Sequence, residues 1–281
     1  MIESFLITSR ETLEASLVIG IVLSYLHRTH NHSYKKNVYY GIIFGILASI
    51  ATAFLFSFFS AEFEGQTESL FEGITMLVGS VLLTTMILWM MKQRHMTAEI
   101  EGKVQKHLEH QSMFSSFGIF LLVFVAIFRE GVETVIFLNA AQYASGVNFI
   151  AGTIGVLAAI LVGYLFFVSV RTVNMKKLFT VSSVLLILFA AGLVAHGVDE
   201  LVDAQVIPAI VDPLYNLNPV MNSDGSYPLL HEQGAIGSFL RGLFGYNGDP
   251  SLIEVSSYFF YLGIIAILFY RVQKSKIPSS A

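Results

Sequence analysis

Long apolar runs alternate with short polar stretches along the whole chain. Seven of these runs are close to the roughly 20 residues that an α-helix needs to cross a bilayer. They occupy residues 4–26, 38–60, 70–91, 114–138, 148–170, 179–198 and 253–270. The pattern predicts an all-α polytopic membrane protein, with seven transmembrane helices in a single domain over residues 1–281.

The composition supports a membrane protein and limits its chemistry. Of the 281 residues, 54% are hydrophobic and 13% are charged, and the mean hydropathy of +0.68 is too high for an ordinary soluble domain. The first residues lack the basic segment and the cleavage site of a signal peptide, so we expect the first run to remain as a helix. Because the chain has no cysteine, thiolate metal sites, iron–sulfur clusters and disulfides are excluded. Carboxylates, imidazoles and thioethers remain as metal ligands.

The basic residues predict the orientation of the chain in the membrane. Of the 16 lysines and arginines, all except Arg10, Arg129 and Arg241 lie in four segments. These segments are residues 27–37, 92–113, 171–178 and the tail after residue 270. The positive-inside rule therefore places the N-terminus outside and the C-terminus in the cytoplasm, in agreement with an odd number of spans. Residues 199–252 are then an extracytoplasmic segment.

The predicted outer side is rich in carboxylates next to the third and sixth runs. The residues concerned are Glu62, Glu64, Glu68, Glu72, Asp199, Glu200 and Asp203. An anionic surface attracts cations and repels anions, so these side chains predict a vestibule for cations. The alternative is an acidic rim that serves only solvation.

Two of the apolar runs carry the same charged motif, R-E-x-x-E. It lies within SRETLEASL at residues 9–17 and within FREGVETVI at residues 128–136. The charged positions are Arg10, Glu11 and Glu14 in the first run and Arg129, Glu130 and Glu133 in the fourth. Residues three and four apart share one face of a helix, so each motif places one arginine and two carboxylates on one stripe. Motifs three spans apart lie on helices of opposite direction, which predicts an inverted repeat of spans 1–3 and 4–6.

The balance of charge in the two motifs indicates a cation. Arginine–glutamate pairs could serve only to hold two helices together. The four glutamates nevertheless outnumber the two arginines, and ionisable residues inside a membrane usually mark a path for substrate or protons. Oxygen ligands suit hard cations, and at this point iron, manganese, calcium and magnesium all remain open.

The paired motifs resemble those of the high-affinity iron permeases, the oxidase-dependent iron transporters, which carry R-E-x-x-E in the first and fourth of seven spans. The resemblance is closest to the bacterial members and includes LFEGI at 70–74, AAGL at 190–193 and GLFGY at 242–246, followed by Pro250 and Glu254. Thr12 departs from the glycine that is commoner at that motif position, whereas Gly131 matches it.

The resemblance implies iron import by a multi-pass permease of the bacterial inner (cytoplasmic) membrane, and not an enzyme. The four motif glutamates would handle the ion with Arg10 and Arg129 as charge partners, and Glu72 and Asp203 would lie near the outer mouth. Iron would be the transported substrate, with no permanent cofactor. A periplasmic oxidase, a peroxidase-like protein or a cupredoxin would be a partner, together with membrane lipid but not nucleic acid.

Three other functions compete with iron import. The first is transport of another hard divalent metal such as manganese, through the same carboxylates. The second is a membrane-embedded di-iron redox protein, but such proteins use Glu-x-x-His on two helices, whereas both motifs here end in glutamate. The third is a proton-coupled carrier of an organic solute. Among the histidines, those of HRTHNH at 27–32 and His95, His107 and His110 are candidate inner ligands, and His196 is a candidate outer ligand near Asp199 and Asp203.

Overall fold

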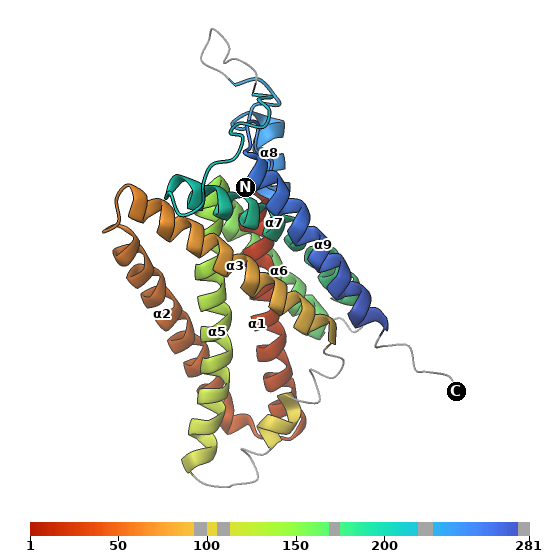
Figure 1. The fold of residues 1–281 in the computed structure, drawn as a ribbon. Helices are drawn as coiled ribbons and strands as arrows, with labels where there is room; N and C mark the ends of the chain where they lie inside the picture. Colours follow the sequence, from red (N-terminus) through yellow and green to blue (C-terminus); the bar gives the residue numbers. More distant parts are fainter. Residues whose placement is uncertain (93–99, 106–112, 169–174, 219–226, 275–281) are drawn as a thin grey trace.

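The computed structural model describes the chain except for residues 93–99, 106–112, 169–174, 219–226 and 275–281 (Figure 1). All regular secondary structure in the described part is helical. The helices are α1 (Ile2–Arg28), the 3-10 turn η1 (His32–Tyr34), α2 (Lys35–Ser60), α3 (Gln66–Lys92), α5 (Met113–Ser145), α6 (Phe149–Val168), α7 (Met175–Asp203), α8 (Ala235–Phe244) and α9 (Leu252–Lys274). The all-α prediction is confirmed.

Five of these helices are long and apolar enough to cross a membrane within the described part of the chain: α2, α3, α6, α7 and α9. The two that carry the R-E-x-x-E motifs are not among them. Helices α1 and α5 contain 27 and 33 residues, so their length of about 1.5 Å per residue is sufficient. Their three motif charges make them less apolar than a simple span. The count of seven spans, the orientation, the inverted repeat and the single permease domain therefore stay predictions.

The outer faces of the bundle are covered by large apolar side chains. On α2, Phe54 and Phe58 are 73% and 64% exposed, and on α9 Phe260 is 72% exposed. On α6, Leu157 and Tyr164 are similarly exposed. Water would penalise apolar patches of this extent, so the exposed faces identify surfaces that contact lipid in a membrane.

The helices pack in pairs that are distant in sequence. Helix α1 lies against α6, α2 lies against α5, and α3 lies against α7, while α1 and α5 also contact each other. One buried core gathers apolar residues of α1, α3, α5 and α7, and a second lies between α1, α2 and α5. The amphipathic helix α8 lies beside the N-terminus at one end of the bundle (Figure 1). This arrangement brings α1 and α5 together at the centre.

Glycines allow the closest helix contacts. A Cβ atom on Gly41 of α2 would lie 2.9 Å from the carbonyl oxygen of Phe120 in α5, and one on Gly45 would lie 2.8 Å from the Ile127 Cβ. On α6, a Cβ on Gly155 would lie 2.7 Å from the carbonyl oxygen of Phe5 in α1. The G-x-x-x-G of Gly41 and Gly45 therefore serves packing within the bundle.

Replacement of Gly41 by valine is expected to destabilise the bundle by about 1–3 kcal/mol, because the new side chain would overlap the α5 backbone. The matched control is Gly263→Val in α9, where an added Cβ meets nothing within 4 Å. Unfolding of the purified variants in detergent measures the difference. Equal stability of the two variants would contradict the tight α2–α5 contact.

Candidate metal site

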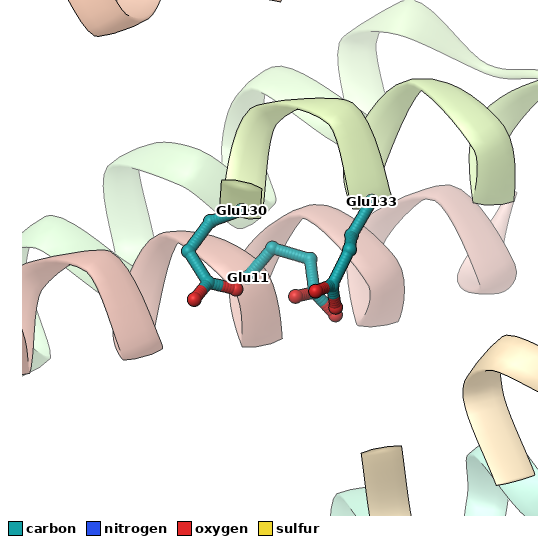
Figure 2. A group of neighbouring side chains, drawn as sticks. All are labelled: Glu11, Glu130 and Glu133. Carbon is teal, nitrogen blue, oxygen red and sulfur yellow. The ribbon is translucent and has the colours of Figure 1, made fainter. Parts of the chain in front are cut away.

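The two R-E-x-x-E motifs lie on α1 and α5 and face each other where these helices meet. Glu11 projects from α1, and Glu130 and Glu133 project from α5 toward it (Figure 2). One carboxylate oxygen from each of these three residues lies within 4.8 Å of the others. The structure therefore brings together carboxylates that are more than a hundred residues apart in the sequence.

The α1 half of the site is enclosed. The guanidinium of Arg10 lies 3.4 Å from Glu11 Oε1 and 3.3 Å from Glu14 Oε1, and all three side chains are buried. Arg10 Nη1 also lies 2.7 Å from the Met86 sulfur of α3. Arg10 thus neutralises part of the charge of Glu11 and Glu14, and α3 closes this half of the site.

The α5 half of the site is more open. Arg129 Nη2 lies 3.3 Å from Glu130 Oε1, and its Nε lies 3.0 Å from Glu133 Oε1. The side chain of Arg129 is 47% exposed, against 1% for Arg10, and its guanidinium lies over the Trp89 ring. A cavity of about 340 Å³ borders this half and is lined by Leu82, Thr85, Met86, Trp89, Arg129 and Glu133. The two R-E-x-x-E motifs therefore have different environments.

Among the described residues, two oxygens of the cluster formed by Glu11, Glu130 and Glu133 lack hydrogen-bond partners. Glu11 Oε2 and Glu130 Oε2 are buried, and neither has a hydrogen-bond partner among the described residues. A buried carboxylate without a partner is costly, and a cation would offset that cost. The donor set consists of carboxylates, which suits hard divalent ions at bond lengths of about 2.0–2.6 Å. The site therefore fits a metal ion.

Gly131 allows α5 to approach α2 closely at the second motif. A Cβ on Gly131 would collide with the Ser49 side chain of α2. Thr12, at the corresponding position of the first motif, is half-buried. The departure at residue 12 therefore leaves all the glutamates of the two motifs in place.

The predicted outer carboxylates divide into two groups. Glu72 at the start of α3 interacts electrostatically with Glu68 and with Glu200 near the end of α7, and Glu200 does so with Asp199 and Asp203. These five carboxylates thus gather where α3 and α7 meet. Glu62 and Glu64 are exposed in the connection between α2 and α3.

The histidines that the sequence suggested as ligands lie in different surroundings. The ring of His32 lies 5.2 Å from that of His27 and 6.2 Å from that of His30, centroid to centroid, at the end of α1. His107 and His110, like His95, lie outside the described residues. His196 is buried in α7 and lies beside Glu254 of α9. Sequence reasoning did not pair these two residues, although Glu254 was noted with GLFGY.

Helices that are long and apolar enough to cross a membrane thus accompany a cluster of carboxylates inside the bundle. The chain belongs to the iron permease FTR1 family, whose family model matches residues 1–278. The family is a class of permeases and not of enzymes.

Relatives of similar length accompany the family match. The "Ferrous iron permease EfeU" of Yersinia pestis is 31% identical over 283 residues, which covers 100% of this chain and 97% of that protein. The protein of the same name from Escherichia coli O6:K15:H31 is 28% identical over 265 residues, covering 93% of this chain and 92% of that protein. An uncharacterized protein of Archaeoglobus fulgidus is 31% identical over 274 residues, with 96% and 95% covered. No solved structure matches significantly.

Proposed function

We propose that the protein imports ferrous iron across the cytoplasmic membrane and that Glu11, Glu130 and Glu133 receive the ion at the centre of the bundle. The observation that carries the proposal is the approach of three carboxylate oxygens from both motifs to within 4.8 Å. Family membership and the relatives named ferrous iron permeases support iron as the substrate.

The surrounding residues then have distinct roles. Arg10 holds Glu14 and Glu11 in place from the closed side. Arg129 is half-exposed at the cavity, so it can release Glu130 and Glu133 with little cost of burial when an ion arrives. The exchange of Arg129 for a divalent cation would keep the local charge close to balance.

We extend the proposal to the topology. If α1 and α5 also cross the membrane, the chain has seven spans, with its N-terminus outside and its C-terminus in the cytoplasm. The packing supports the inverted repeat: exchanging α1, α2 and α3 with α5, α6 and α7 converts the α1–α6 contact into the α5–α2 contact and leaves α3–α7 in place. The carboxylates of the shared site then lie on the axis that relates the halves.

The membrane potential provides the energy in this proposal. Two positive charges that move inward gain about 4.6 kcal/mol per 100 mV, at about 2.3 kcal/mol for each charge. That free energy corresponds to a concentration ratio of roughly a thousandfold.

The acidic group at the α3–α7 end is the proposed entrance. Glu68, Glu72, Glu200, Asp199 and Asp203 would raise the local concentration of cations there. Glu62 and Glu64 would extend this anionic surface. A periplasmic oxidase, peroxidase-like protein or cupredoxin would deliver iron to this end.

Manganese transport is the second candidate function, because a site of carboxylate oxygens also suits Mn²⁺. A di-iron redox protein has less support, since the candidate metal-binding cluster in the described part of the chain contains glutamates alone.

Uptake of Fe²⁺ into proteoliposomes tests the proposed function. We expect anaerobic Fe²⁺ uptake that depends on protein, increases with an inside-negative potential and is inhibited only weakly by equimolar Mn²⁺. Uptake no faster than in protein-free liposomes would overturn the proposal. Faster uptake of Mn²⁺ than of Fe²⁺ would favour the second candidate function.

A further inference from the structure

A second pair of potential metal ligands lies away from the central glutamates. His196 of α7 and Glu254 of α9 are both buried, with side-chain exposures of 11% and 2%. His196 Nδ1 lies 3.3 Å from Glu254 Oε1. Among the described residues, His196 Nε2 and Glu254 Oε1 have no hydrogen-bond partner. The two side chains are therefore close together, yet each keeps a buried polar atom without a hydrogen bond.

The distance between the two donor atoms suits a shared ion. Metal–nitrogen and metal–oxygen bonds of about 2.0–2.2 Å, at the angles of tetrahedral or octahedral sites, separate neighbouring ligand atoms by roughly 3.0–3.5 Å. Glu254 Oε1 and His196 Nδ1 already have this separation. An ion between them would satisfy a carboxylate oxygen that otherwise remains buried without a partner.

The neighbouring side chains orient Glu254 and leave room for water. Asn247 donates a hydrogen bond of 2.8 Å to Glu254 Oε2, which leaves Oε1 free to face His196. Asp199, one turn after His196, accepts a hydrogen bond from Ser251 and adds negative charge near Glu254. Glu254 also lines a mainly apolar cavity of about 270 Å³, whose polar lining residues include Tyr215, Tyr246, Asn247 and Tyr258. The cavity can supply water ligands and a route for an ion.

We propose that His196 and Glu254 form a second binding site for a divalent transition-metal ion, at the end of the bundle that carries α8. One imidazole and one carboxylate favour Fe²⁺ and similar ions over Mg²⁺ and Ca²⁺, which prefer oxygen ligands alone. Two protein ligands leave the remaining positions to water, which suits an ion that binds and leaves again. The site does not depend on the central glutamates being the transport site.

Equilibrium dialysis of the purified full-length protein against anaerobic Fe²⁺ tests the proposal. The background is the variant Glu11→Gln with Glu130→Gln, so that the central carboxylates contribute little. We expect this background to bind Fe²⁺ in the presence of excess Mg²⁺. Adding Glu254→Gln or His196→Gln should weaken that binding by about tenfold or more.

The controls separate a metal site from a structural contact between α7 and α9. Glu101→Gln and His231→Gln remove a glutamate and a histidine elsewhere and should leave Fe²⁺ binding unchanged. Thermal unfolding of the background should shift upward with Fe²⁺, and that shift should disappear with the nearly isosteric Glu254→Gln. Fe²⁺ binding and a thermal shift that persist in folded Glu254→Gln and His196→Gln would overturn the proposal, whatever uptake shows. Binding that Mg²⁺ displaces completely would also overturn it.

Discussion

Replacement of Glu130 by glutamine is expected to decrease Fe²⁺ uptake by about tenfold or more. Changes to residues that merely support metal ligands usually cost 10–100-fold in affinity or activity, and Glu130 is proposed as a ligand itself. The substitution keeps the shape of the side chain and removes one charge from the cluster with Glu11 and Glu133. Initial rates of uptake into energised proteoliposomes measure the effect.

The control for this prediction is Glu101→Gln. Glu101 pairs with Arg28 in a contact that is mostly exposed, with side-chain exposures of 30% and 65%, so its loss should change stability by less than about 1 kcal/mol. We expect uptake by Glu101→Gln to equal that of the original protein. Unchanged uptake by folded Glu130→Gln would show that the motif glutamates only hold α1 and α5 together.

Replacement of Arg10 by glutamine is expected to destabilise the protein far more than replacement of Arg129 by glutamine. Arg10 is the buried partner of Glu11 and Glu14, and the loss of one member of a buried ion pair costs about 3–5 kcal/mol. Arg129 is 47% exposed and its partner Glu133 is 20% exposed, so removal of Arg129 leaves at least one of its two partner carboxylates accessible to water. The yield of folded protein from membranes and its unfolding in detergent compare the two variants.

A second substitution checks the cause of the Arg10 effect. Glu14→Gln in the Arg10→Gln background removes one of the two unpaired carboxylates, so part of the lost stability should return. If Arg10→Gln and Arg129→Gln are equally stable, the difference in burial between the two halves of the site has no energetic consequence.

The helical fold and the position of the charged motifs could be predicted from the sequence because they depend on local patterns. The run at 114–138 predicted α5 from its second residue onward, but the helix extends over Met113–Ser145 and ends seven residues later than the run. The extension through Asn139 and Gln142 was missed because these polar residues end the apolar run. Their helical conformation depends on packing and not on hydropathy.

The environments of the two motifs could not be predicted, because the same R-E-x-x-E pattern is covered by different residues of other helices in each case. Arg10 and Arg129 occupy equivalent positions in the two motifs. In the structure Met86 contacts the buried Arg10, whereas the half-exposed Arg129 lies over the Trp89 ring. Burial of this kind depends on which residues of α3 cover each motif. The partnership of His196 with Glu254 likewise depends on the contact between α7 and α9.

Anomalous diffraction at the iron edge, from crystals grown anaerobically with Fe²⁺, tests the central role of the paired motifs most directly. We expect an iron peak between Glu11, Glu130 and Glu133, at about 2.0–2.6 Å from their oxygens. The peak should disappear in crystals of Glu130→Gln. Iron peaks found elsewhere in the protein, with none between these three glutamates, would contradict their role as the central iron site.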